Sequence, residues 1–183
     1  MGIRRVVTGH DASGNAVFVS DDTVDPITLA LLPGTEFYRL WGADEPPSFP
    51  DDGSSAPHPG YFPPVGGFRF GLFTVAPDAE SNIEDLDMEA AVTEMHEKLP
   101  GLSEYLELDH PGMHTTATID YEYVVSGRCL LELDNGETRE VGPGDTIIQN
   151  GTRHAWRNPF DEPCVMVVAL FGAHHAAVTP AAG

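Results

Sequence analysis

Short runs of apolar and β-branched residues recur along most of the chain, separated by glycine, proline and asparagine. This pattern is typical of β-strands joined by turns in a sandwich or barrel. In the first part of the chain it predicts strands at 3–7, 16–20, 35–41 and 67–76. In the second part it predicts strands at 121–125, 128–133, 140–141, 145–149 and 164–171. Asn135-Gly136 supplies the positive φ angles of a tight turn, which predicts a hairpin there.

Two segments interrupt the β pattern. Prolines, glycines and acidic residues crowd together between Gly42 and Gly67, and this composition predicts a long loop or arm, suited to a lid, a binding loop or a dimer contact. Further on, apolar residues recur at helical spacing after an acidic start and before Pro100-Gly101: Met88, Ala91, Val92 and Met95. They predict one amphipathic helix whose apolar stripe faces the core. A second, short helical turn is expected at 102–106.

The net charge of the chain restricts the classes of partner that it can bind. The 183 residues include 9 Lys and Arg against 29 Asp and Glu, a formal net charge of −20. Such a field repels phosphate backbones and anionic lipid headgroups, so neither nucleic acid nor a membrane is expected as a partner. No apolar run is long enough to span a bilayer, and a cytoplasmic protein is expected. The two cysteines, Cys129 and Cys164, lie in apolar runs and are expected to be buried free thiols.

Two spaced motifs carry the candidate chemistry. The first is His114-x-Thr116-x3-Asp120-x6-Gly127, and the second is Gln149-x-Gly151-x2-His154-x3-Asn158. Together they resemble the two motifs of the cupin superfamily. The resemblance implies an all-β fold: a double-stranded β-helix, or jelly-roll barrel, with N-terminal strands, a long arm and one or two short helices. It divides the chain into N-terminal strands, arm and helix (1–109), a barrel core (110–172) and a flexible tail (173–183).

The resemblance also implies a metal centre. In cupins three histidines and a glutamate hold one metal ion, whereas here Thr116 stands at the second histidine and Asp120 at the glutamate. The carried-over ligands are therefore His114, Asp120 and His154, around a single divalent ion such as Fe, Mn, Ni, Cu or Zn. Threonine is a poor ligand and aspartate is one methylene shorter than glutamate. A metal-bound site and a metal-free acid–base site both stay open.

Strand alternation adds a further candidate. If the segment is extended, alternation places Glu122 on one face with His114, Thr116, Thr118 and Asp120. Burial in an apolar barrel would raise the pKa of Glu122 and suit it to acid–base catalysis, with His154 as the second catalytic group. A salt-bridged or rim position for Glu122 is the alternative. Four residues of the motifs are expected to contact substrate: Thr116, Gln149, Trp156 and Asn158. Packing of Trp156 in the barrel wall and orientation of a loop by Asn158 are the structural alternatives.

The function that follows is a small-molecule-binding cupin, interpreted as a metabolic enzyme acting on a small organic acid, a sugar or a polyketide-like compound. The candidate enzyme classes are isomerases, cyclases and lyases on one side and metal-dependent oxygenases on the other. A non-catalytic ligand-binding domain is the alternative, because the fold does not select a reaction. A homodimer is expected by analogy with other cupins.

Overall fold

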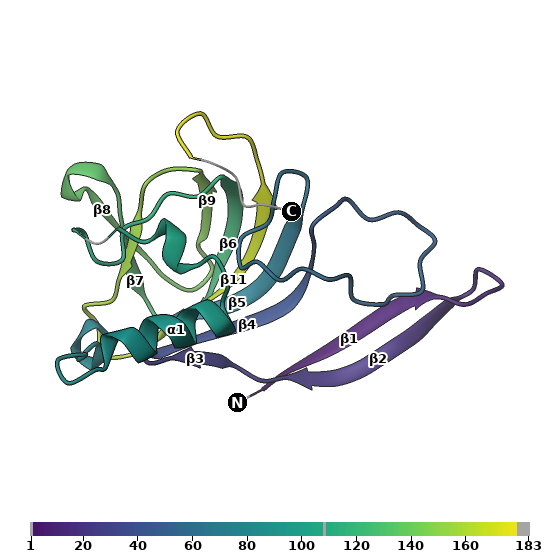
Figure 1. The fold of residues 1–183 in the computed structure, drawn as a ribbon, viewed down its shortest axis with the longest axis horizontal. Helices are drawn as coiled ribbons and strands as arrows, with labels where there is room; N and C mark the ends of the chain where they lie inside the picture. Colours follow the sequence, from purple (N-terminus) through teal and green to yellow (C-terminus); the bar gives the residue numbers. More distant parts are fainter. Residues whose placement is uncertain (1, 108, 179–183) are drawn as a thin grey trace.

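The computed structural model describes residues 2–107 and 109–178 and is built mainly from antiparallel strands (Figure 1). The N-terminal strands are β1 (Ile3–His10), β2 (Ala16–Val24), β3 (Ile27–Leu29), β4 (Leu32–Ala43) and β5 (Phe68–Val75). The later strands are β6 (Thr118–Ser126), β7 (Cys129–Glu132), β8 (Thr138–Val141), β9 (Thr146–Asn150), β10 (Ala155–Arg157) and β11 (Cys164–Gly172). Helical elements are α1 (Met88–Lys98) and three 3-10 turns: η1 (Asp78–Glu80), η2 (Ser103–Tyr105) and η3 (Asp134–Gly136).

Two sheets form the barrel. A six-stranded sheet has the order β3-β4-β5-β11-β6-β9, and a three-stranded sheet has the order β10-β7-β8. One core cluster between them contains both cysteines, which are buried and free as expected. The all-β fold and every strand predicted from the pattern are confirmed, while β3 and β10, each three residues long, were not predicted. Strands this short carry too little periodicity to be found in a sequence.

Glycine and asparagine fix two of the turns. Asn135 and Gly136 have φ angles of 62° and 71° in the β7–β8 hairpin, as the Asn-Gly pair predicted. Gly127, in the first motif, has a φ of 70°, and a Cβ there would lie 2.1 Å from the carbonyl oxygen of Pro163. Any larger residue would collide with the backbone that enters β11. The glycine of the motif is therefore required by the fold.

Helix α1 begins at the predicted place, capped by the side chain of Asp87, which accepts a hydrogen bond from the Ala90 amide. Its apolar stripe is only half buried. Ala91 and Met95 are in the core, whereas Met88 and Val92 are 50% and 38% exposed. The helix therefore covers one end of the six-stranded sheet beside β3, with the N-terminal part of its stripe in solvent.

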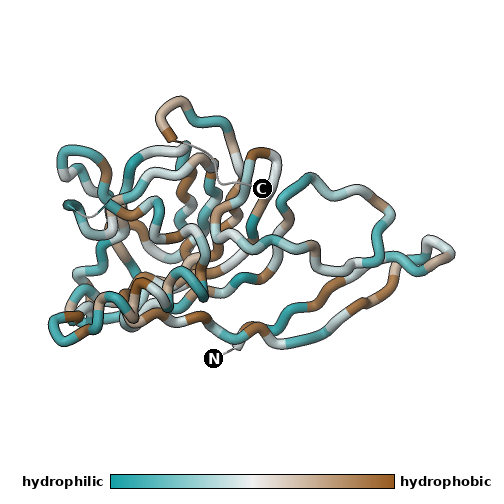
Figure 2. The backbone as a smooth tube through the Cα atoms, viewed as in Figure 1, coloured by the Kyte–Doolittle hydropathy of each residue, from teal (hydrophilic) through white to brown (hydrophobic). Residues whose placement is uncertain are grey.

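Strands β1 and β2 form a two-stranded sheet of their own, which we call the N-terminal hairpin. The N-terminal hairpin extends away from the barrel, and Figure 2 shows hydrophobic stretches on both of its strands. Arg5 attaches its base to the barrel by donating to the Leu40 carbonyl (2.9 Å) and by lying over the Trp41 ring. Near the tip, the His10 amide donates to the Asp51 carbonyl of the long loop (2.7 Å).

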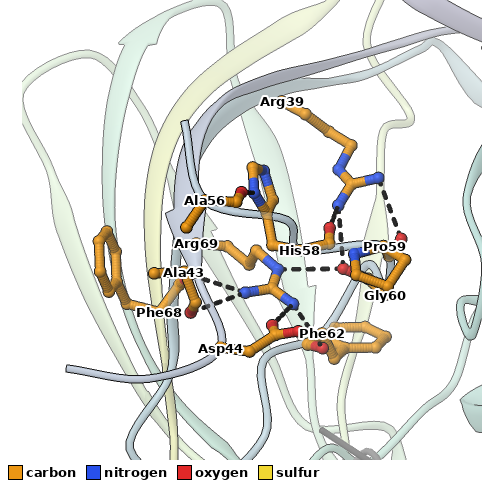
Figure 3. Close-up of polar contacts among 10 residues, drawn as sticks. All are labelled: Arg39, Ala43, Asp44, Ala56, His58, Pro59, Gly60, Phe62, Phe68 and Arg69. Carbon is orange, nitrogen blue, oxygen red and sulfur yellow. Dashed lines mark hydrogen bonds and ion pairs between the residues drawn. The ribbon is translucent and has the colours of Figure 1, made fainter. Parts of the chain in front are cut away.

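The predicted long loop is present between β4 and β5, and two arginines hold it (Figure 3). Arg39 donates to the carbonyls of His58, Pro59 and Gly60. Arg69 donates to the carbonyls of Gly60, Ala43 and Phe68 and to the carboxylate of Asp44, at 2.5–3.0 Å. Both guanidinium groups therefore meet at the Gly60 carbonyl oxygen. This clamp directs the end of the loop, residues 61 and 62, back toward the barrel.

Two further expectations concern the C-terminal tail and the ability of a helix to span a membrane. The predicted flexible tail begins at residue 173, and its last part, residues 179–183, lies outside the described residues. Among the helices that the structure describes, none has the length and hydrophobicity needed to cross a membrane.

Candidate functional site

A partly open cavity of about 190 Å³ lies against the inner face of the six-stranded sheet. Its walls are mostly apolar and aromatic, and its polar side chains include four that the motifs and strand alternation singled out: His114, Asp120, Glu122 and His154. The aromatic walls come from β4, β5, the end of the long loop and β10: Phe37, Phe73, Tyr61, Phe62 and Trp156. No Lys or Arg is among the described residues that line it.

Strand β6 carries the two carboxyl groups that line the cavity. Alternation along the strand places Thr118, Asp120, Glu122 and Val124 on the inner face, and all four are buried. Asp120 Oδ1 and Glu122 Oε2 have no hydrogen-bond partner among the described residues. A buried polar atom without a partner costs about 1–3 kcal/mol. Such atoms are kept only where something else compensates, and in a cavity a bound ligand can do so.

Burial controls the ionisation of both acids. Desolvation raises the pKa of Asp120 to about 6, against a smaller lowering effect of a hydrogen bond from Thr118. Desolvation also raises the pKa of Glu122 well above its usual value, and the nearby charge of Asp120 raises it further. Two carboxyl groups that share a dry site do not both ionise readily. Of the two carboxyl groups, Glu122 is therefore the one whose proton is held by both burial and the neighbouring charge.

The two histidines face each other near the start of β6. Their backbones form a bridge in which each amide donates to the other's carbonyl at 3.0 Å, and their rings lie 4.2 Å apart between centroids. His114 Nδ1 is 3.0 Å from the Gly112 carbonyl, and His154 Nδ1 is 2.8 Å from the Thr152 carbonyl. Because a carbonyl only accepts, each Nδ1 carries the proton. The Nε2 lone pairs are left as acceptors.

Both imidazoles are neutral at physiological pH. Burial lowers the pKa of His154 to about 4, helped by the adjacent His114, and burial also lowers the pKa of His114. The cavity thus combines two neutral imidazole bases with two carboxyl groups whose pKa values are raised. This is the pairing of acceptor and donor that general acid–base chemistry requires.

The metal centre implied by the motifs does not fit this arrangement. The two Nε2 atoms are oriented as they would be for a metal, with Nδ1 held by a carbonyl. A third ligand is missing from the set, because nowhere in residues 2–107 and 109–178 do three His, Cys, Asp or Glu side chains group so that they could hold an ion. Thr116 Oγ1 is occupied with Thr118 Oγ1 at 2.7 Å. Asp120 lines the cavity but does not complete a triad with His114 and His154.

Of the four residues expected to contact substrate, one lines the cavity wall and three are buried elsewhere in the fold. Trp156 lines the cavity, and its ring centroid lies 6.2 Å from that of His154. Thr116, Gln149 and Asn158 are buried but do not line the cavity. Strand β6 begins only at Thr118, so Thr116 lies outside the extended segment that was expected to carry it inward.

Asn158 orients loops, which is the structural alternative to contact with a substrate. Its side chain donates to the carbonyls of Val75 and Glu162 (both 2.8 Å) and accepts from the Phe160 amide (3.1 Å), and it is fully buried. With these bonds made inside the protein, the amide has little left to offer a ligand. Gln149 accepts from Thr152 Oγ1 at 2.8 Å and leaves its Nε2 buried without a partner among the described residues.

The residues that sequence reasoning missed are those of the walls. Tyr61 and Phe62 reach the cavity from the end of the long loop, and their rings contact each other edge-to-face at 4.9 Å. Burial and the charge of Asp120 both raise the pKa of the Tyr61 phenol, which places its hydroxyl within the electrostatic reach of the acids. The only signal in the sequence is an aromatic pair at the end of a Pro- and Gly-rich segment.

Comparisons with known proteins agree with the fold and the motifs. The family model described as "Cupin domain" matches residues 107–170. Phomopsin biosynthesis cluster protein C' of Diaporthe leptostromiformis is 30% identical over 84% of this chain and 69% of that protein. The cupin-domain-containing oxidoreductase srdB of Neurospora crassa is 28% identical over 91% of this chain and 71% of the relative. Oryzines biosynthesis cluster protein J of Aspergillus oryzae is 44% identical, over 27% of this chain and 30% of that protein.

The chain therefore belongs to the cupin superfamily, a class of small β-barrel proteins that the motifs, the sheets and the relatives define together. The match to the oryzines protein spans less than a third of that protein's length. The two longer matches cover 84% and 91% of this chain.

Proposed function

We propose that this cupin is an enzyme of small-molecule biosynthesis that transfers protons on a neutral, carbonyl-bearing ring compound. The observation that carries the proposal is the pair of buried oxygens without a partner among the described residues, Asp120 Oδ1 and Glu122 Oε2, on strand β6, which faces a cavity walled by aromatic rings. A carbonyl oxygen bound there would accept the hydrogen bond that protonated Glu122 can donate.

The cavity lining selects among the substrate classes that the sequence left open. An organic acid would enter beside two carboxyl groups with no Lys or Arg among the described lining residues to neutralise it. A sugar would leave many hydroxyls against apolar walls without partners. A polyketide-like ring has flat apolar faces for the aromatic walls and a carbonyl for the acids. A cavity of about 190 Å³ is somewhat larger than one of roughly 150 Å³ that accepts benzene, which suits one substituted ring.

The reaction assigned to these groups is enolisation. His154 Nε2, neutral and with its lone pair free, removes a proton from the carbon next to the carbonyl. Glu122 donates its proton to the carbonyl oxygen, so the enol forms with no net change in charge of substrate and acid–base pair together. Returning the proton to a different carbon, or expelling a leaving group from the enol, gives an isomerisation or a dehydration. General acid–base catalysis of this kind contributes roughly 10²–10⁴-fold in rate.

Two relatives are named for biosynthesis clusters, which supports a role in biosynthesis. The relative srdB is named an oxidoreductase, a name that favours redox chemistry over proton transfer. Metal-dependent oxygen chemistry, the other candidate enzyme class, requires a ligand triad, and the side chains of the described residues do not supply one. A non-catalytic cupin that only binds such a ring is the competing proposal, and the same experiment separates the two.

The test is hydrogen–deuterium exchange at the carbon next to the carbonyl, measured by proton NMR in D₂O with a panel of single-ring ketones. The wild-type protein is expected to catalyse the exchange. The Glu122→Gln variant should bind the same ketone but lose roughly 100-fold or more of the rate, whereas the exposed Glu97→Gln should match wild type. Binding without exchange by the wild-type protein would contradict catalysis and favour the binding role. A fully active Glu122→Gln would remove Glu122 as the proton donor.

A further inference from the structure

Two rows of paired residues cross the inner face of the six-stranded sheet. Residues paired across antiparallel strands share a face, so the members of each row point toward the interior of the barrel. Each row runs from an arginine, through an aliphatic residue of β11, to an acid of β6. The rows are Arg39-Gly71-Val168-Glu122 and Arg69-Leu170-Asp120. Because neighbouring strands lie about 4.8 Å apart, roughly 10–14 Å of sheet separates the arginines from the acids.

The ring of Tyr61 lies over this strip of sheet. It lines the cavity that contains the two acids, and it also lines a smaller space that reaches the two arginines of the clamp. Val168 and Leu170 of β11 line both spaces. Tyr61 therefore stands between the guanidinium groups and the carboxyl groups.

Contacts on several sides fix the ring of Tyr61. It meets the Phe37 ring edge-to-face at 5.8 Å between centroids and the Phe62 ring at 4.9 Å. The Tyr61 amide donates to the Pro100 carbonyl (2.8 Å), and the preceding residue, Gly60, is held by the clamp (Figure 3). The hydroxyl makes no hydrogen bond to any of the described residues. A rigid ring thus presents a hydroxyl that a ligand can use.

The charges around the Tyr61 hydroxyl show which side of the cavity it faces. Burial is the main cause of its raised pKa, and the charge of Asp120 is the next. Arg39 has a weaker and opposite effect, and Glu122 adds a smaller increase. The hydroxyl therefore faces Asp120. Because its pKa is raised, it keeps its proton and acts as a hydrogen-bond donor.

Asp120 Oδ1 is the group that matches this donor. It is a buried acceptor without a hydrogen-bond partner among the described residues, on a residue that is 5% exposed. Tyr61 does not supply the missing bond, since the side-chain hydrogen bond that acts on the Asp120 carboxyl comes from Thr118. A single ligand group that satisfies both residues must donate to Asp120 and accept from Tyr61. A hydroxyl does both, whereas a carbonyl or ether oxygen only accepts and an ammonium only donates.

We propose that Tyr61 and Asp120 form a subsite for a hydroxyl group, and that the substrate is a hydroxylated, carbonyl-bearing ring compound. Its hydroxyl donates to Asp120 Oδ1 and accepts from the Tyr61 hydroxyl, while its carbonyl accepts from Glu122. The placement of the carbonyl rests on the proposed function. Asp120 and Glu122 are successive inward positions of β6, roughly 7 Å apart along the strand, so the two oxygens belong to different carbons of the substrate.

The subsite makes Tyr61 a residue that determines specificity. A ligand without the hydroxyl would cover Tyr61 and Asp120 and leave both without a partner, and sites built to bind a hydroxyl reject such analogues. A buried hydrogen bond of this kind is worth roughly tenfold in affinity. A purely apolar wall would give the opposite preference, because it would leave the ligand hydroxyl without a partner.

The test compares acetophenone with its ortho-, meta- and para-hydroxy derivatives, which differ from it only by the hydroxyl. Isothermal titration calorimetry gives the dissociation constants for wild type, Tyr61→Phe and Tyr121→Phe. Wild type should bind at least one hydroxy isomer roughly tenfold or more tightly than acetophenone. Tyr61→Phe should lose most of this preference without losing affinity for acetophenone. Tyr121→Phe removes an exposed hydroxyl from an outward position of β6 and should keep the preference.

A double variant tests whether Asp120 belongs to the same subsite. Asp120→Asn replaces the charged acceptor by a weaker one and should reduce the preference in part. When it is combined with Tyr61→Phe, the loss should be smaller than the two single losses multiplied together, because both substitutions act on one ligand hydroxyl. Independent losses would overturn the shared subsite. Thermal unfolding of each variant checks that the barrel is intact.

Binding and proton exchange separate this proposal from the proposed function. Exchange is measured in the same compounds at the methyl carbon next to the carbonyl. A preference for a hydroxy isomer that Tyr61→Phe removes supports the subsite, even where no exchange occurs and the proposed catalysis fails. A wild-type protein that prefers none of the hydroxy isomers overturns the subsite, even where exchange is catalysed. A preference that Tyr61→Phe retains in full overturns it as well.

Discussion

Replacing Asp120 by asparagine tests the electrostatics of the cavity without requiring a substrate. The substitution keeps the size of the side chain and removes its charge. Burial raises the pKa of Asp120 from 3.8 to about 6 in the folded protein. The folded state therefore binds the proton more tightly than the unfolded state, so this group destabilises the fold progressively as pH rises from about 3.8 to about 6. Above that range the cost is constant.

The size of the effect follows from the shift. A change from 3.8 to about 6 corresponds to about 3 kcal/mol of unfolding free energy once the carboxyl is ionised in both states. About half of this, roughly 1.4 kcal/mol, develops between pH 5 and pH 8. Asparagine carries no charge at any pH. The stability of Asp120→Asn relative to wild type should therefore increase by roughly 1.4 kcal/mol over that interval.

The assay is urea denaturation of wild type, Asp120→Asn and the exposed control Asp85→Asn at several pH values from 5 to 8. A chelator in every sample prevents adventitious metal from binding the carboxylates. The decisive quantity is how the difference in unfolding free energy between Asp120→Asn and wild type depends on pH. An altered hydrogen bond would change that difference by the same amount at every pH. A difference between Asp120→Asn and wild type that stays constant from pH 5 to pH 8 would refute the reasoning, because Asp120 would then not be desolvated.

Two further predictions concern the scaffold. Asn158→Ala should lower the unfolding free energy by about 3 kcal/mol, since three buried hydrogen bonds are lost. Urea denaturation measures this loss, with the exposed Asn82→Ala as the control. A loss of less than about 1 kcal/mol would contradict the role of Asn158 in orienting the loops. Arg69→Lys should accelerate limited proteolysis between residues 44 and 60, because one ammonium cannot replace a guanidinium that holds four partners. Arg128→Lys, a surface ion pair, is the control, and an unchanged cleavage rate would count against the clamp.

The strands were predictable because their apolar runs are bounded by strong turn residues. The inward direction of Asp120 and Glu122 was also predictable, since it follows from alternation along β6 once the strand is known. The resemblance to the cupin motifs implied that His114 and His154 share one site, and the backbone bridge between them shows that they lie side by side.

The rest of the site depends on contacts that spacing does not encode. Thr116 was expected to point inward by alternation, but β6 begins two residues later and Thr116 bonds to Thr118. The parity of Phe68, Phe70 and Leu72 was readable, but whether that face lay inward or outward depended on the register with β11. Tyr61 reaches the cavity because two distant arginines hold its loop, and no local pattern records this.

The clamp formed by Arg39 and Arg69 binds the loop through backbone carbonyls at positions 58, 59 and 60. Every amino acid carries that carbonyl, so at these three positions the anchor does not depend on the side chain, and the one loop side chain that contributes to the clamp is the carboxylate of Asp44. Mutations within the loop can accumulate without releasing it, and residues 61 and 62 can change while still being presented to the cavity. The barrel and its acids would then stay constant while the wall that meets the ligand diverges. Descendants of this chain could acquire new substrates by altering two positions, and a protein engineer could exchange the same two residues to redirect specificity.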